Sequence, residues 1–442
     1  MKNGDVIELE IIDMSQEGNG IGKYDNVVVF VEGAILGEVV KVEIIKAKKS
    51  FMLAKAIETI KASEYRTEEE CRYEKVCGGC SLLNVSYEGQ LKIKSKAVTD
   101  KLKRIAKIEN PKVNPIIAMD NPYRYRNKTK FSVNDKRVGF FKKKSNTVVC
   151  DCLECKIQPD VSMAVAEALR QFIIEDHIKK GVFESVTVKI AEGTGQVMVV
   201  FNINGKGIPN SDKLIIMINE EINNLEDMHV LSSVVQIIGS GKATLLAGEK
   251  TITDKVTMGK EFNFEISAES FYQVNTKQMI KLYEKVMEYA DLKGDETVYD
   301  LYCGVGTIGL TLADKAKYVV GIDSVKEAVL NANRNATINN IVNAIYKHGK
   351  AEDILPELIT ERPSDVVILD PPRNGCDERL LNTIAESDAK KIVYVSCDPG
   401  TLARDIKILE DQGYKFIEAT PLDMFPWTVH VETVVLMSRV EK

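Results

Sequence analysis

Cys397 is the residue whose type and surroundings point most directly to chemistry. It lies in the segment SCDPG (residues 396–400), after a run of β-branched and aromatic residues that predicts a buried strand. Open α/β sheets bind their ligands at the carboxyl ends of such strands. Because Pro399 and Gly400 end the strand, we expect the thiol on a turn, where a helix starting near Thr401 would stabilise a thiolate. A buried structural thiol is the alternative, and the turn favours a nucleophile.

A glycine-rich turn, residues 303–309 with the sequence CGVGTIG, follows another predicted strand and opens a helix predicted over 310–316. Glycines let a cofactor approach the backbone, and Asp323 ends the next strand, where an acid accepts both ribose hydroxyls of a nucleotide cofactor. Asp300 precedes the first glycine in a D-x3-G-x-G pattern. This pattern favours S-adenosylmethionine over NAD, and hence a methyltransferase over an oxidoreductase. Asp370 ends a further strand beside the same crevice.

Nine cysteines in a chain without a signal-peptide core argue for metal binding or catalysis rather than disulfides. Three of them fall within ten residues of a polar segment, which predicts metal ligation: Cys71, Cys77 and Cys80. A second group offers the fourth ligand: Cys150, Cys152 and Cys155. Four thiolates would also suit zinc. The spacing C-x5-C-x2-C with a distant fourth cysteine is closer to an iron–sulfur site than to paired zinc knuckles.

The elements that must position these residues fall into three regions, so the predicted fold is multidomain. Residues 1–60 contain short strands punctuated by glycine, over 6–12, 27–31, 38–45 and 54–60, which predicts a small OB-like β-barrel. Residues 61–265 form an α/β central domain that carries the cysteine site, with helices over 161–174 and 211–224 and strands over 186–191 and 196–202. Residues 266–442 show the regular βα repetition of a Rossmann-like α/β domain.

The charge of the chain is unevenly distributed. The net charge is −6, yet residues 89–144 carry 17 Lys and Arg against four Asp and Glu. A positive block on an acidic body would steer a polyanion to one face. Within it, aromatic and basic residues alternate over 123–130 (YRYRNKTK), a pattern that suits stacking on bases and pairing with phosphates. The block therefore favours a nucleic-acid partner over a merely solvated helix face.

Together these segments resemble the uracil-C5 RNA methyltransferases over nearly the whole chain. The glycine-rich stretch at 18–23 and the apolar run at 27–33 resemble a TRAM domain, a small RNA-binding barrel attached to RNA-modifying enzymes. The other matching segments are the cysteines of 71–80 and the motifs at 271–275, 300–306, 370–373, 396–399 and 423–432. Trp427 departs from the pattern, because relatives often have His at that position.

The resemblance implies roles for individual residues of this chain. Four would contact S-adenosylmethionine: Gln273, Tyr302, Asp323 and Asp370. Four would hold a [4Fe-4S] cluster: Cys71, Cys77, Cys80 and Cys155. Cys397 would be the nucleophile and Glu432 the base. The combination of cluster and TRAM domain resembles the branch that acts on 23S rRNA more than the branch that acts on tRNA.

This chemistry explains why a thiol and a base are both needed. Uracil C5 is a poor nucleophile until a thiolate adds to C6 and makes an enolate, after which C5 can take a methyl group. The adduct is released when a base such as Glu432 removes the C5 proton. A stacked base cannot present C6 to a thiol, so the target uridine must be flipped out or lie in a loop.

Other functions remain open from the sequence. A tRNA substrate is one, an S-adenosylmethionine enzyme that methylates an exocyclic nitrogen through DPPR (370–373) is a second, and a noncatalytic RNA-binding protein with a vestigial methyltransferase fold is a third. No apolar run reaches the roughly 18 residues needed to cross a bilayer, so we expect a cytoplasmic protein that makes no membrane contact. We also expect a monomer.

Overall fold

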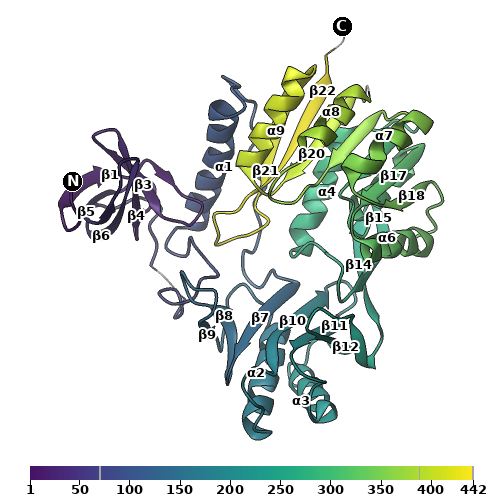
Figure 1. The fold of residues 1–442 in the computed structure, drawn as a ribbon, viewed down its shortest axis with the longest axis horizontal. Helices are drawn as coiled ribbons and strands as arrows, with labels where there is room; N and C mark the ends of the chain where they lie inside the picture. The colour runs from purple at the N-terminus through teal and green to yellow at the C-terminus, as the bar shows by residue number, and fades with distance from the viewer. Residues whose placement is uncertain (69–70, 388, 441–442) are drawn as a thin grey trace.

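The computed structural model describes residues 1–68, 71–387 and 389–440. Three bodies are visible in Figure 1: a small N-terminal sheet, a central sheet flanked by two helices, and a larger C-terminal sheet covered by helices. No helix within these ranges is long and apolar enough to cross a membrane. The boundaries predicted after residues 60 and 265 stay predictions.

The N-terminal sheet contains six strands in the order β1-β5-β6-β4-β3-β2. Their bounds are β1 (Val6–Glu10), β2 (Asp13–Met14), β3 (Gly20–Tyr24), β4 (Val27–Glu32), β5 (Val39–Ala47) and β6 (Phe51–Lys61). Side chains alternate between the core and the surface along β1, where Ile7 and Leu9 are buried. β1 also packs against β3, so the sheet curls on itself. The four predicted strands are confirmed, and β2 and β3 are additional.

Helix α1 (Tyr87–Arg104) lies between the N-terminal sheet and the C-terminal body (Figure 1). The Ser86 side chain caps it by accepting a hydrogen bond from the Gly89 N–H. Its apolar residues Val98 and Leu102 are fully buried in the core of the C-terminal body, where α1 packs against α9 (Pro399–Asp411) and β21 (Tyr414–Leu422). A segment that precedes the central sheet in sequence therefore packs against the C-terminal sheet.

The central sheet has seven strands in the order β13-β12-β11-β10-β7-β8-β9. They are β7 (Lys128–Asn134), β8 (Arg137–Phe141), β9 (Val149–Asp151), β10 (Phe183–Ala191), β11 (Gln196–Ile203), β12 (Val230–Ile238) and β13 (Thr244–Gly248). Helices α2 (Asp160–Glu175) and α3 (Ser211–Asn223) bury their apolar faces against it. Both helices and the predicted strands β10 and β11 are confirmed.

The C-terminal sheet also has seven strands, in the order β18-β17-β16-β19-β20-β22-β21. They are β16 (Thr297–Leu301), β17 (Tyr318–Asp323), β18 (Ala344–His348), β19 (Val366–Leu369), β20 (Lys391–Ser396), β21 and β22 (Glu432–Arg439). The first five pair in parallel, and β22 runs antiparallel to its neighbours. The order reverses beside β16, and doubly wound sheets bind their ligands at such a switch point.

Helices cover this sheet, and a hairpin packs against two of them (Figure 1). The helices are α4 (Thr276–Ala290), α5 (Thr307–Leu312), α6 (Lys326–Ile338), α7 (Ala351–Glu361), α8 (Glu378–Glu386) and α9, with a short 3-10 turn η1 (Ala313–Lys315). The hairpin of β14 (Thr251–Met258) and β15 (Lys260–Ser267) packs against α4 and α6. Two helices start earlier than predicted, α5 at Thr307 and α9 at Pro399. The α9 helix can start at Pro399 because proline is well tolerated in the first turn of a helix.

Candidate active site

Parallel pairing collects the predicted site residues at one edge of the C-terminal sheet. The carboxyl ends of β17, β16, β19 and β20 meet there, and antiparallel β22 begins there. Five predicted residues occupy this edge, in order across the sheet: Asp323, Tyr302, Asp370, Cys397 and Glu432. Residues far apart in sequence are thereby brought into one row.

A pocket at this edge is lined by three of the four residues predicted to contact the cofactor: Gln273, Tyr302 and Asp370. The glycine-rich turn supplies another wall. Asp323 lies beside it, since its Oδ2 accepts a hydrogen bond of 2.9 Å from the Gly304 N–H. These residues fit an adenosyl cofactor, because a carboxylate stands where ribose hydroxyls would be held and the backbone of the turn is open to approach.

The turn itself is held in an unusual backbone conformation. Tyr302 and Gly306 have φ angles of 64° and 81°, in the left-handed region that favours glycine. A Cβ on Gly306 would stand 2.7 Å from the Tyr346 ring, so glycine is required there. Asp300 is fully buried and accepts a hydrogen bond of 2.8 Å from the Gly309 N–H, which ties the turn to β16. Burial raises the pKa of Asp300 to about 7.

Cys397 follows β20 on a turn, as predicted, but the expected stabilisation of its thiolate is wrong. The pKa of Cys397 is raised to about 11, chiefly by burial and also by the nearby Glu432 and Asp370 carboxylates, while Arg373 acts to lower it. The helix N-terminus does not compensate, because Asp398 already uses it: its Oδ1 accepts hydrogen bonds from the N–H groups of the first turn of α9, at 2.8 and 2.9 Å. The substrate-free protein therefore keeps Cys397 as a thiol.

Glu432 faces Cys397 from the first position of β22 and is only 5% exposed. Burial, and then the Asp370 carboxylate, raise its pKa to about 8, while Arg373 lowers it. Asp370 itself has a pKa raised to about 7 by burial. A carboxyl with a pKa near neutrality can accept and release a proton in the physiological range, which suits a general base. Sequence analysis assigned no role to Arg373, although its position at the end of the DPPR motif (370–373) could have suggested that it lies in the site.

The four cysteines predicted to hold metal line one cavity of about 140 Å³: Cys71, Cys77, Cys80 and Cys155. Burial and the neighbouring cysteines raise the pKa of Cys80, whereas the side chain of Cys152 lowers the pKa of Cys77 to about 7. Within the described ranges, no three or more His, Cys, Asp or Glu side chains gather closely enough to hold a single metal ion. The predicted ligands therefore surround one space without converging on a point.

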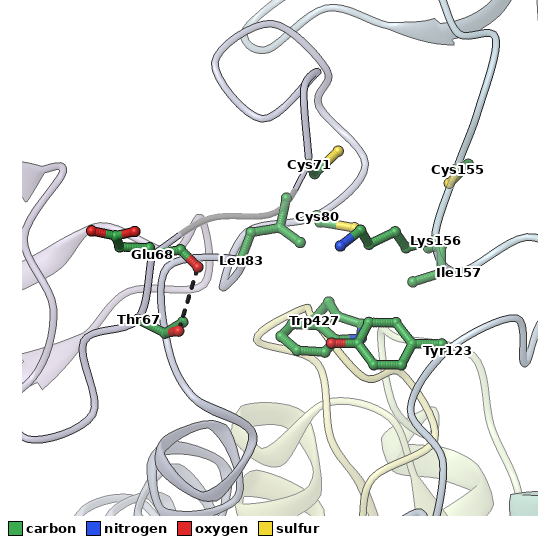
Figure 2. Close-up of a pocket in the computed structure, with 10 residues that line it drawn as sticks. All are labelled: Thr67, Glu68, Cys71, Cys80, Leu83, Tyr123, Cys155, Lys156, Ile157 and Trp427. Atoms are coloured by element: carbon green, nitrogen blue, oxygen red, sulfur yellow. Dashed lines mark hydrogen bonds between the residues drawn. The ribbon is translucent and has the colours of Figure 1, made fainter.

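An adjoining cavity joins this site to an aromatic pair (Figure 2). Cys71, Cys80 and Cys155 line one side of it, and Tyr123 and Trp427 line the other. The Tyr123 and Trp427 rings stack with centroids 5.1 Å apart. Trp427 also donates its indole N–H to the Pro122 carbonyl at 2.9 Å. Trp427, which departs from the family pattern, thus connects the stretch around Tyr123 in the positive block (89–144) with the cysteine site.

The fold of the chain agrees with comparisons to known proteins. The model of the tRNA (uracil-5-)-methyltransferase family matches residues 86–440, and the TRAM domain model matches residues 1–57. The chain belongs to the tRNA (uracil-5-)-methyltransferase family. It is therefore an S-adenosylmethionine-dependent enzyme that methylates C5 of uracil in RNA, with an N-terminal TRAM domain and a C-terminal methyltransferase fold.

Individual proteins of this kind are similar over their full length. An uncharacterized RNA methyltransferase of Clostridium acetobutylicum is 41% identical, with 100% of this chain and 98% of that protein covered. A second, from Caldanaerobacter subterraneus, is also 41% identical, with 99% of each covered. Among solved structures, the tRNA (uracil-54, C5)-methyltransferase of Pyrococcus abyssi in complex with S-adenosyl-L-homocysteine superposes with a TM-score of 0.75 and 27% identity, covering 97% of this chain and 99% of that one.

Sequence analysis did not predict one contact between the TRAM domain and the turn that carries Cys397. Gln16 lies in the loop between β2 and β3, and its Nε2 donates to Asp398 Oδ2 at 3.2 Å. In the same loop, Gly18 has a φ of 79°, and a Cβ there would lie 2.6 Å from the Ser81 carbonyl oxygen. No local pattern could have indicated this docking, because both partners are distant in sequence.

Proposed function

We propose that the enzyme methylates C5 of a specific uridine in 23S rRNA through a covalent bond between Cys397 and C6. The observation that carries this proposal is the placement of Cys397 and Glu432 at one sheet edge, directly beside the pocket lined by Gln273, Tyr302 and Asp370. Methylation of an exocyclic nitrogen with Asp370 as the only catalytic residue would give no role to the Cys397 thiol or to the buried Glu432.

The residues of this chain divide the reaction between them. Arg373 is a cation near Cys397, and we assign it to stabilising the thiolate as the thiol loses its proton to solvent water. The thiolate forms a bond to C6 of the uracil, which places electron density on C5. S-adenosylmethionine, when bound, supplies the methyl group that C5 takes. Glu432 then removes the proton from C5, and the bond between sulfur and C6 breaks to release Cys397 and the methylated base.

We further propose that Cys71, Cys77, Cys80 and Cys155 hold a [4Fe-4S] cluster. Their lining of one shared cavity of about 140 Å³ and the C-x5-C-x2-C spacing with a distant fourth cysteine support this assignment. The cluster would have a structural role, since no step of the methyl transfer requires it.

A tRNA substrate is the second candidate. It is supported by the similarity to the Pyrococcus abyssi enzyme, which acts on uracil 54 of tRNA. The basic segment and the TRAM domain support RNA binding in either case.

The test is to map methylation and to trap the adduct. The protein is incubated with S-adenosylmethionine and unmodified 23S rRNA or tRNA, and 5-methyluridine is located in nuclease fragments by mass spectrometry. On the RNA that is methylated, Glu432→Gln should accumulate a covalent protein–RNA adduct, and Cys397→Ala should form none while still binding S-adenosylmethionine. Methylation in tRNA alone would replace the substrate and keep the mechanism. Turnover by Cys397→Ala would refute the mechanism.

A further inference from the structure

The segment from Asp423 to Val431, here called the strap, connects β21 to β22 and ends directly before Glu432. It has neither helix nor strand along its length. Its conformation must therefore come from contacts with the rest of the molecule. The strap leads directly into Glu432, whose backbone also pairs with Leu422 of β21, so the strap and the sheet together set where the Glu432 side chain enters the site.

Five consecutive carbonyl groups of the strap accept hydrogen bonds from donors outside it. The bonds are Gln278 Nε2 to Asp423 (3.0 Å), Asn275 Nδ2 to Met424 (3.1 Å), Lys94 Nζ to Phe425 (3.0 Å), Tyr125 Oη to Pro426 (3.1 Å), and the Ser81 and Leu82 N–H groups to Trp427 (3.0 Å each). These donors come from α4 and its N-cap, from α1, from the basic stretch at 123–130, and from the two residues that follow Cys80. The strap is thus held in place from several sides before any substrate arrives.

Lys94 is the only cation among these donors, and it makes two contacts. Its Nζ bonds to the Phe425 carbonyl and also forms an ion pair with Asp423 Oδ1. Both side chains are fully buried, at 0% exposure. The other hydrogen bonds to the Phe425 carbonyl come from Thr428, which is part of the strap and cannot anchor it. Lys94 therefore ties two points of the strap, two residues apart, to the body of α1.

A buried ion pair contributes little to the free energy of unfolding, because desolvation of the two charges offsets most of their attraction. Charged donors do give shorter and stronger hydrogen bonds than neutral ones, and they fix geometry. A fully buried lysine at this place is better explained by what it holds. The mechanism above makes no chemical use of either charge.

We propose that Lys94 is a positioning residue for the proton-removal step, holding the strap so that Glu432 meets the C5 proton of the adduct. This inference rests on the proposed function of Glu432. Cys397 is carried by a different connection, between β20 and α9, so the strap does not set where its sulfur lies. Loss of Lys94 should therefore slow removal of the C5 proton without slowing formation of the bond between Cys397 and C6.

The experiment compares full-length Lys94→Met with wild type on the RNA transcript that the wild type methylates. On transcripts containing 5-fluorouridine, whose adduct cannot lose a proton from C5, Lys94→Met should form adduct at the wild-type rate. On native transcripts it should accumulate the adduct and release product about 100-fold more slowly, the loss typical of a misplacement near 1 Å. Lys317→Met, which replaces an exposed lysine outside the positive block of residues 89–144, is the matched control and should behave as wild type.

Because Lys94→Met leaves the Asp423 charge buried without its partner, a second variant guards against misfolding. Lys94→Met/Asp423→Asn contains neither charge but still lacks the anchor of the strap, and it should show the same accumulation with a restored melting temperature. Equal slowing of both steps, or product release at the wild-type rate, would overturn the proposal. If wild type itself forms no adduct with 5-fluorouridine RNA, the proposed function fails first, and the assignment of Lys94 falls with it.

Discussion

The suppressed reactivity of Cys397 can be tested without RNA or cofactor. With a pKa of about 11 against 9.0 for an ordinary thiol, Cys397 has about 100-fold less thiolate at pH 7. A more basic thiolate is intrinsically more nucleophilic, with a Brønsted coefficient of about 0.5, which recovers about tenfold. The net expectation is that iodoacetamide alkylates Cys397 about tenfold more slowly than a free cysteine at pH 7, and that the rate keeps rising beyond pH 10.

Glu432→Gln changes this profile in a predictable direction. Cys397 titrates at a pH where Glu432, with a pKa of about 8, is ionised. Removal of that negative charge should lower the pKa of Cys397 and speed its alkylation. The pKa should stay above that of a free thiol, because burial is the largest cause of the shift and is unchanged.

The assay is alkylation at a series of pH values, followed by mass spectrometry of the peptide that contains Cys397. Glu386→Gln, which removes an exposed carboxylate from α8, is the matched control and should leave the profile unchanged. Two results would refute the reasoning: alkylation of wild-type Cys397 at pH 7 as fast as that of free cysteine, or an identical profile in Glu432→Gln.

Two further predictions concern stability and metal content. Glu432 has a folded-state pKa of about 8 against a reference of 4.5, so the folded state binds its proton more tightly and stability falls as the pH rises from about 4.5 to 8. Glu432→Gln should therefore melt at a higher temperature than wild type at pH 9, with the difference vanishing near pH 4.5; an unchanged difference across this range would contradict the assigned burial. Anaerobically purified protein should show a broad absorption band near about 400 nm that Cys155→Ser loses, and stoichiometric zinc without the band would exclude the cluster.

The sheet edge could be predicted because parallel strands impose its geometry. Acids and a thiol placed directly after apolar runs, such as Asp323, Asp370 and Cys397, must meet at one edge once the strands pair. Glycine-rich β3 gives a weak strand pattern, which is why it was missed.

Long-range contacts explain what the sequence could not reveal. The burial of Val98 and Leu102 against the C-terminal sheet depends on partners more than 250 positions away in the numbering. The pKa of Cys397 was misjudged mainly because burial, the largest cause of its rise, follows from the packing of the folded chain. Asp398 adds a local reason, since it caps the helix N-terminus that was expected to stabilise the thiolate.

Trp427 has a consequence beyond packing, because it is the one tryptophan of the chain. Its indole shares a cavity with Cys71, Cys80 and Cys155, and it belongs to the strap that leads to Glu432. Nearly all intrinsic emission of the protein therefore originates at the junction of the cysteine site and the catalytic sheet. An iron–sulfur cluster bound by these cysteines would quench the tryptophan emission by energy transfer. The intensity of that emission would therefore report cluster binding in real time without an added label.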